Sequence, residues 1–127
     1  MLGAQLDTSA YLTRLKDEIE RLDQAAIQRW SNLVYEAWDQ EKFIFVFGNG
    51  GSGTSATHFV EDLGKSSLRP EDLMDESKKR LKIIGLADNL GWILAVGNDV
   101  GYDQIFQQQL MNYGSKGDFC LLYTSDA

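Results

Sequence analysis

Shortages of cysteine, proline and basic residues narrow the classes of protein to which this chain can belong. Its one cysteine, Cys120, excludes an internal disulfide framework. Nineteen acidic residues against twelve basic ones give a formal charge of −7, which argues against a sequence-independent nucleic-acid binder. No apolar run is long enough to span a membrane and no secretory leader opens the chain, so we expect a cytoplasmic protein with neither nucleic acid nor membrane as a partner.

The rest of the composition is typical of one globular domain. The chain has 127 residues and a single proline, with 43% hydrophobic and 24% charged residues. That length is enough to bury a real core. The acidic balance does not exclude a small anionic ligand, because a local nest of backbone amides can hold one on an acidic protein.

Residues 1–40 are expected to be mainly helical. Apolar side chains recur every three or four residues from Leu12 to Leu22, and a second series follows on a rotated face. The shift indicates a break near Asp23, which can cap a second helix. The apolar stripe of the first helix would pack either on its own domain or on a partner subunit. We favour the partner and expect a homo-oligomer, either a dimer or a tetramer.

The remainder alternates between strand-like and helix-like segments. Continuous apolar runs at 42–48 and 81–87 indicate buried parallel strands, and a third strand should begin near Phe119. Helices are expected from about 53 to 63 and over 101–114. This alternation predicts an α/β fold, a three-layer αβα sandwich with a parallel sheet, preceded by the helical N-terminus.

The stretch FVFGNGGSGTSATHFVED, residues 45–62, indicates a phosphate site where a strand runs into a helix. Gly48, Gly50 and Gly53 match a dinucleotide fingerprint, but the acidic residue that it needs is misplaced, since Asp88 lies too far along the chain. A P-loop would need a lysine where Thr54 stands. Three hypotheses remain, namely a nucleotide, a plain tight turn and a small phosphorylated ligand, of which we favour the last.

One histidine and one acid share a helical face just beyond the glycines. His58 and Asp62 are four residues apart, and Ser55 lies on nearly the same face. The pair would hold a metal, or place a base over the carbon chain of the ligand. An ordinary surface pair on a helix is the alternative.

A second polar cluster follows the second expected strand. Asn98 and Asp99 stand between Gly97 and Gly101 in an otherwise apolar stretch. They would either cap a helix or recognise a hydroxyl of the ligand, since loops at the carboxyl ends of parallel strands gather at one edge of the sheet.

Taken together, these segments resemble the SIS (sugar isomerase) domain family, and within it the phosphoheptose isomerases. The first family motif is matched by residues 48–52 with His58 and Phe59. The second is matched by residues 97–99 with Gly101, Ile105 and Phe106. The likeness runs from about residue 7 to residue 118, and it implies the SIS fold with a sugar-phosphate site at the glycine turn and no nucleotide.

The resemblance also assigns roles to individual residues. It implies that His58 and Asp62 hold zinc and that Asp62 is the catalytic base. The family has a glutamate at the position of Asp62, and the shorter aspartate would set the carboxylate back by about 1.5 Å. The substrate contacts that it implies are Asn49, Gly50, Gly51, Ser52, Ser55, Asn98 and Asp99.

The implied reaction is an aldose–ketose isomerisation of sedoheptulose 7-phosphate or a similar sugar phosphate. In it, a base takes the proton next to the carbonyl and the proton returns to the adjacent carbon. The alternative is a non-catalytic SIS-domain regulator that binds a phosphosugar or a protein partner.

The end of the sequence departs from the family. The resemblance implies a further phosphate loop and a last helix that completes the metal site, so we expect residues 41–119 to be a partial SIS domain that is inactive by itself. The closing string CLLYTSDA, residues 120–127, resembles the in-frame translation of a transposase sequencing-library adapter, and we expect it to be non-native. The alternative is a genuine third strand, because FCLLYT would serve as one.

Overall fold

The computed structural model describes residues 7–124 and divides the chain into two compact units between Asn32 and Leu33. Helix α1 spans Thr8–Glu20 and helix α2 spans Gln24–Asp39. The predicted break at Asp23 is confirmed, because its carboxylate accepts a hydrogen bond of 3.0 Å from the amide of Ala26. Asp7 caps α1 in the same way, through the amide of Ala10 at 2.8 Å.

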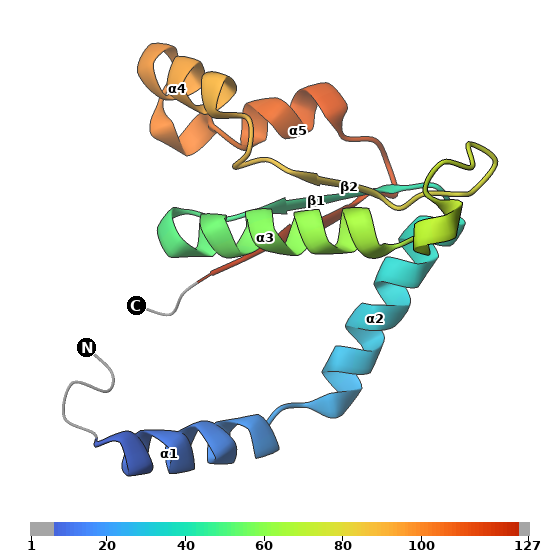
Figure 1. Ribbon diagram of the computed structural model, residues 1–127. Coiled ribbons are helices and arrows are strands. Elements are labelled where there is room, and N and C mark those ends of the chain that lie inside the picture. The colour runs from blue at the N-terminus through green and yellow to red at the C-terminus, as the bar shows by residue number, and fades with distance from the viewer. Residues whose placement is uncertain (1–6, 125–127) are drawn as a thin grey trace. The chain divides into compact units, whose positions relative to one another are not determined.

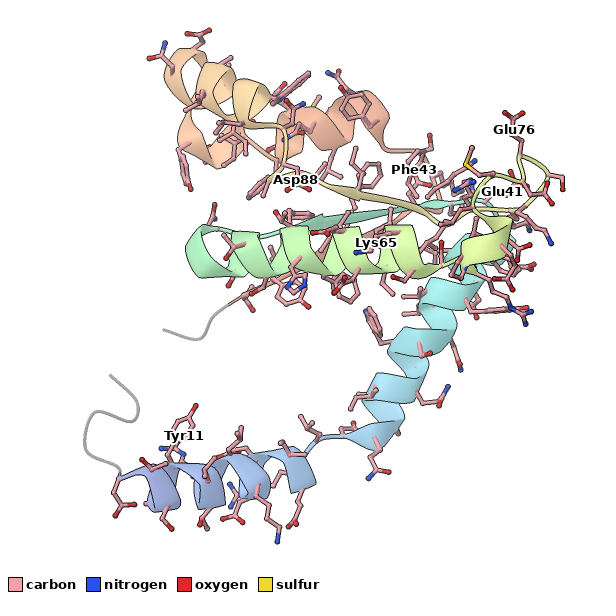
Figure 2. All side chains as sticks on the ribbon, viewed as in Figure 1. Tyr11, Glu41, Phe43, Lys65, Glu76 and Asp88 are labelled. Carbon is pink, nitrogen blue, oxygen red and sulfur yellow. The ribbon has the colours of Figure 1, made fainter. Side chains whose placement is uncertain are left out.

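All of α1 is exposed, including its apolar stripe. Leu12, Leu15 and Ile19, with Leu22 just beyond the end of the helix, keep between 44% and 58% of their surface exposed. Tyr11 also projects from this helix (Figure 2). The stripe is therefore a surface that nothing covers among the described residues of its own unit.

The second unit is built on a parallel sheet, which confirms the predicted fold class (Figure 1). Strand β1 spans Phe43–Phe47, β2 spans Lys82–Gly85 and β3 spans Phe119–Leu122. Their order is β2-β1-β3, so β1 is central and pairs in parallel with both neighbours.

Side chains of β1 alternate between two packed faces. Ile44 and Val46 join Ala37 of α2 and Ala56 of α3 in one buried cluster. On the opposite face Phe45 is 1% exposed, and Phe47 packs its ring 5.1 Å from that of Phe106. Helices therefore cover the sheet on both sides, as Figure 1 shows for α3 on one face and α4 and α5 on the other.

The helices of this unit differ from the prediction in two places. Helix α3 spans Gly50–Ser66 and begins three residues before the predicted start. The prediction was late because glycines, which have low helix propensity, make up most of the first turn. Helix α4, Leu90–Asp99, was not predicted at all. The expected helix over 101–114 is instead a 3₁₀ turn, η2, at Tyr102–Gln104 and a short helix, α5, at Gln107–Tyr113. A second 3₁₀ turn, η1, covers Pro70–Asp72.

The predicted burial of β2 was only partly right. β2 is an edge strand whose Ile84 remains 37% exposed, while Gly85 and the following Leu86 are buried. At the other edge, the pairing with β1 extends one residue past β3, because the amide of Tyr123 donates to the carbonyl of Phe47 at 2.8 Å. Residues 119–122 are thus able to form a strand, while the adapter origin of residues 120–127 stays a prediction that this pairing does not test.

Candidate functional site

The turn between β1 and α3 brings two backbone segments into close contact. Gly48 follows β1 and is buried, and a Cβ atom built on it would lie 2.8 Å from the carbonyl oxygen of Tyr123. A Cβ atom built on Gly53 would lie 2.8 Å from the carbonyl oxygen of Gly48. Both separations are too short for a side chain, so glycine at these positions lets the start of α3 rest against the end of β1.

The two glycines between them in the chain, Gly50 and Gly51, face open space. Gly50 has a φ of +53°, the left-handed region that glycine adopts without steric cost, and Cβ atoms on Gly50 or Gly51 would meet nothing within 4 Å. The amide of Gly53 donates to the carbonyl of Asn49 at 3.1 Å, which is the first bond of the helix. The amides of Gly50, Gly51 and Ser52 precede that bond and have no acceptor within the helix.

These free amides make the start of α3 electropositive. The helix dipole adds to the partial positive charge of the amides, and the residues of the first turn, Gly50–Gly53, carry no charge that would oppose an anion. A left-handed residue followed by helical ones also turns successive N–H groups toward one point, which is the geometry of an anion-binding nest. The turn is therefore suited to a phosphate or a carboxylate.

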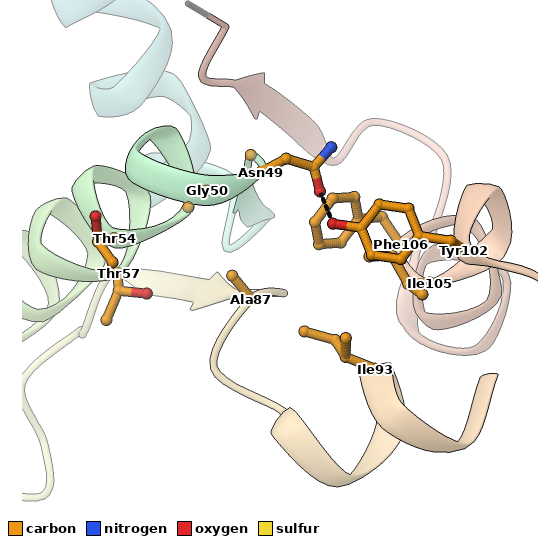
Figure 3. A pocket seen from close by; sticks show the side chains of 11 residues that line it. Asn49, Gly50, Thr54, Thr57, Ala87, Ile93, Tyr102, Ile105 and Phe106 are labelled. Atoms are coloured by element: carbon orange, nitrogen blue, oxygen red, sulfur yellow. Dashed lines mark hydrogen bonds between the residues drawn. The ribbon is translucent and has the colours of Figure 1, made fainter. Parts of the chain in front are cut away.

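A pocket of about 230 Å³ opens beside the turn (Figure 3). Its lining is uncharged, with polar groups from the turn, α3 and η2 and apolar groups from α4 and the segment around η2. The lining residues are Gly48, Asn49, Gly50, Gly53, Thr54, Thr57, Ala87, Ile93, Tyr102, Ile105 and Phe106.

Hydrogen bonds fix several polar side chains around this pocket. The hydroxyl of Tyr102 donates to Oδ1 of Asn49 at 2.9 Å, and Figure 3 shows this bond at the rim. The hydroxyl of Thr57 donates to a carboxylate oxygen of Asp88 beyond the end of β2. The hydroxyl of Thr54 turns back to the carbonyl of Gly51 at 2.8 Å.

Comparison with known proteins assigns the chain that carries this turn to a family. The sequence profile described as the SIS domain matches residues 9–125, which is most of the chain. The chain belongs to the SIS domain family. The likeness predicted from the glycine turn and from residues 97–106 is confirmed.

Individual SIS relatives agree with this assignment. The chain is 35% identical over 106 residues to a phosphoheptose isomerase of Buchnera aphidicola subsp. Acyrthosiphon pisum, covering 84% of this chain and 48% of that protein. It is 32% identical over 125 residues to the phosphoheptose isomerase of Buchnera aphidicola subsp. Schizaphis graminum, with coverage of 95% and 58%. The chain thus spans about half the length of the curated relatives that it matches.

Solved structures show the same fold. A phosphoheptose isomerase from Francisella tularensis superposes with a TM-score of 0.72 at 27% identity, covering 90% of this chain and 57% of that one. A phosphoheptose isomerase from Neisseria gonorrhoeae gives a TM-score of 0.71 at 24% identity, covering 87% and 53%, which supports the fold alone.

The site residues that were predicted from the sequence lie on two different sides of α3. Asn49 and Gly50 line the pocket, and Ser52 contributes an amide at the helix start. Gly51 and Ser55 lie outside the pocket, and the Ser55 hydroxyl donates to the carbonyl of Gly51 at 3.1 Å.

His58 and Asp62 form the expected pair. Nε2 of His58 lies 3.1 Å from a carboxylate oxygen of Asp62, and the two side chains are 76% and 58% exposed. Counting along the helix places His58 and Asp62 each within about 20° of Gly51, whereas Asp62 is about 140° from the pocket-lining Thr57. The pair therefore belongs to an exposed stripe that begins at Gly51 and lies outside the pocket.

A zinc site would need more than this pair. Zinc takes three protein ligands in catalytic sites and four in structural ones. Within residues 7–124, no group of three His, Cys, Asp or Glu side chains is close enough to hold a metal. Lys65 also lies near Asp62, with its ammonium 3.8 Å from a carboxylate oxygen, and is not a ligand. The described residues alone do not fit a complete zinc site.

Asn98 and Asp99 are placed differently from the loop that was expected. They are the last two residues of α4, both are exposed, and Nδ2 of Asn98 donates to the Asp99 carboxylate at 2.7 Å. The pocket is lined instead by Ile93, one turn earlier, and by Tyr102 just after them. Neither Asn98 nor Asp99 caps the helical segments that follow, because the N-cap positions of η2 and α5 are Gly101 and Phe106.

Thr57, Ile93 and Tyr102 line the pocket but were not predicted as site residues. Thr57 carried a usable signal, because it lies four residues beyond Gly53 and therefore on the same helical face. Ile93 and Tyr102 reach the pocket only through the packing of α4 and η2, which no local pattern encodes.

Proposed function

We propose that this chain carries the sugar-phosphate site of an aldose–ketose isomerase acting on sedoheptulose 7-phosphate or a closely similar sugar phosphate. The observation that carries the proposal is the glycine turn, with its uncapped amides at the start of α3, in a chain of the SIS domain family. The names of its relatives, phosphoheptose isomerases, supply the substrate class.

The phosphate binds at the amides of Gly50, Gly51 and Ser52. Backbone donors and the helix dipole hold the dianion without a lysine, which accounts for Thr54 at the position of the P-loop lysine. Binding at this end fixes the ligand for chemistry at its other end. Asn49 and the hydroxyls of Ser52 and Ser55 complete the cradle in this proposal.

The carbon chain of the sugar runs along the exposed stripe of α3. His58 lies about 10 Å beyond Gly51 along the helix axis, on the same side. There Asp62 takes the proton next to the carbonyl, held in place by its contact with His58. The sugar contacts implied for Asn98 and Asp99 are not part of this path, because both residues end α4, on the opposite face of the sheet from α3 (Figure 1).

Zinc at His58 and Asp62 is part of the proposal, with further ligands from outside residues 7–124. When bound, it would polarise the carbonyl oxygen of the sugar. Zinc titration of the unaltered chain and of His58→Gln tests this, and loss of the histidine should weaken any zinc binding at least tenfold.

The protein is proposed to act in the cytoplasm as a homo-oligomer, whose contacts include the apolar stripe of α1. The exposed leucines and isoleucine of that stripe support the proposal. Among the described residues, no helix is both long and apolar enough to cross a membrane. Sedimentation of the unaltered chain and of Leu15→Glu would show whether the stripe joins subunits.

Calorimetric titration with sedoheptulose 7-phosphate and with NAD tests the proposed ligand. The sugar phosphate should bind more tightly, and Gly50→Val should abolish its binding, because valine cannot adopt the left-handed φ at position 50 without strain. Gly91→Ala is the control, since it adds a methyl group in open space on α4, away from the pocket. Tighter binding of NAD that is insensitive to Gly50→Val would refute the proposal.

Turnover separates the isomerase from a regulator. Conversion of sedoheptulose 7-phosphate by the chain or its natural parent supports the isomerase. Binding of the sugar phosphate without conversion by the parent would favour the non-catalytic SIS-domain regulator.

A further inference from the structure

Asn49 occupies a helix-capping position but does not cap. Three other helices have Asp or Asn in this position, and each uses its side-chain oxygen to accept from the amide three residues later: Asp7 from Ala10, Asp23 from Ala26 and Asn89 from Trp92. The equivalent partner of Asn49 is the amide of Ser52. Among the described residues, the Asn49 side chain caps no amide of α3.

The oxygen that would make this cap is bound by Tyr102 instead. The phenol hydroxyl of Tyr102 donates to Oδ1 of Asn49 at 2.9 Å, across 53 residues of sequence (Figure 3). The bond draws the Asn49 side chain toward η2 on the pocket side of the turn. The amide of Ser52 is thereby left without the acceptor that Asn normally supplies.

The backbone that carries the donor is anchored near the turn. Tyr102 begins η2, and its carbonyl accepts from the amide of Ile105 at 3.4 Å. Ile105 is buried, and the adjacent Phe106 packs against Phe47 at the end of β1. These contacts anchor the backbone of Tyr102 close to the strand from which the glycine turn starts, while its side chain is 63% exposed and reaches the turn through the bond to Asn49.

We propose that Tyr102 is a positioning residue that keeps the start of α3 open for phosphate. By holding Asn49 away from the helix, it prevents the side chain from capping Ser52, which would occupy a donor that the ligand needs. The inference rests on the proposed function, because it assumes that a phosphate binds at these amides.

A residue with this role should affect stability and phosphate binding in opposite directions. If Tyr102 were only structural, loss of its hydroxyl would lower stability and affinity together. If it withholds a cap, its loss frees Asn49 to bond with Ser52, so the chain keeps or gains stability while phosphate binding weakens. If the Asn49 cap competes with phosphate for the amide of Ser52, the affinity for phosphate should fall about fivefold.

Tyr102→Phe tests the inference, with Tyr113→Phe as the matched control. Tyr113, the last residue of α5, packs against Trp92 of α4 and lies outside the pocket, so removing its hydroxyl should leave binding unchanged. Inorganic phosphate and sedoheptulose 7-phosphate are titrated calorimetrically, and urea unfolding is measured on the same samples. Tyr102→Phe should bind both ligands about fivefold more weakly, with an unfolding midpoint equal to or above that of the unaltered chain.

A double-mutant cycle identifies the route of the effect. In an Asn49→Gly background no side chain is left to cap Ser52, so adding Tyr102→Phe should change affinity no further. An equal loss in both backgrounds would mean that the hydroxyl contacts the ligand directly, and it would overturn the inference. Unchanged affinity in Tyr102→Phe, or a fall in both stability and affinity, would overturn it as well. If the unaltered chain binds neither ligand, the proposed function fails and the inference fails with it.

Discussion

Gly53→Ala is expected to damage the turn even though alanine favours helices. The new methyl group would lie 2.8 Å from the carbonyl oxygen of Gly48 and 3.5 Å from its carbon. Gly48 cannot easily retreat, because it is buried and its own Cα already faces the carbonyl of Tyr123. The first turn of α3 must therefore move away from β1.

The size of the effect follows from a comparison with Gly91→Ala. Both glycines lie in the first turn of a helix, so both substitutions share the gain in helix propensity, about 1 kcal/mol at most. A methyl group on Gly91 meets nothing within 4 Å, whereas one on Gly53 overpacks the backbone. Overpacking typically costs about 1–3 kcal/mol, and Gly53→Ala should be less stable than Gly91→Ala by that amount.

Urea denaturation of the two variants and the unaltered chain measures this difference directly. Gly91→Ala should unfold at an equal or higher urea concentration than the unaltered chain, and Gly53→Ala at a lower one than Gly91→Ala. If both variants were equally stabilised, the close contact between Gly48 and Gly53 would be refuted, and with it the geometry of the site.

Three further predictions concern other parts of the chain. Glu41 has a φ of 56° in the turn after α2, so Glu41→Gly should stabilise the fold by about 1 kcal/mol in urea unfolding, and a loss of stability would contradict that strain. In a form that turns over sugar phosphate, Asp62→Asn should lower the isomerisation rate about 100-fold or more and leave the affinity largely unchanged. Glu61→Gln should change the rate little, and equal effects of the two substitutions would refute the role of Asp62. Burial, and then the charge of Asp118, raise the pKa of Cys120 above its usual range, so its thiol should react with iodoacetamide only at a higher pH than an unhindered thiol, and reaction at a lower pH would contradict this.

The parts of the fold that local sequence dictates were predictable. β1 was recognisable because aromatic and β-branched residues run without interruption from Phe43 to Phe47 and end in glycines. The break at Asp23 was recognisable because a capping residue stands where the apolar face rotates. In both cases the signal lies within a few residues of the feature that it predicts.

Features that depend on tertiary packing were not predictable in the same way. α4 is apolar on nearly all sides, with Leu90 and Leu94 more than 60% exposed, so its sequence lacks the periodicity that marks a surface helix. The start of α3 was placed at Gly53, since glycine propensity argues against helix, yet the structure begins it at Gly50. The bond between Tyr102 and Asn49 joins elements that are far apart in the chain, and nothing near either residue indicates it.

The candidate site was predictable in its anchor and less so in its surroundings. The glycine turn follows from a strand that ends in glycines before a helix, and the pairing of His58 with Asp62 follows from helical spacing. Sequence alone did not show that this pair and the pocket lie on different sides of α3, because that depends on which face of the helix packs against the sheet.

Backbone amide NMR of the chain, titrated with sedoheptulose 7-phosphate, tests the central claim most directly. If the free amides at the start of α3 hold the phosphate, the signals of Gly50, Gly51 and Ser52 should shift most, moving downfield as their N–H groups bond to the anion, and inorganic phosphate should shift the same signals. Saturating shifts that fall elsewhere in residues 7–124, with these three amides unmoved, would contradict the account.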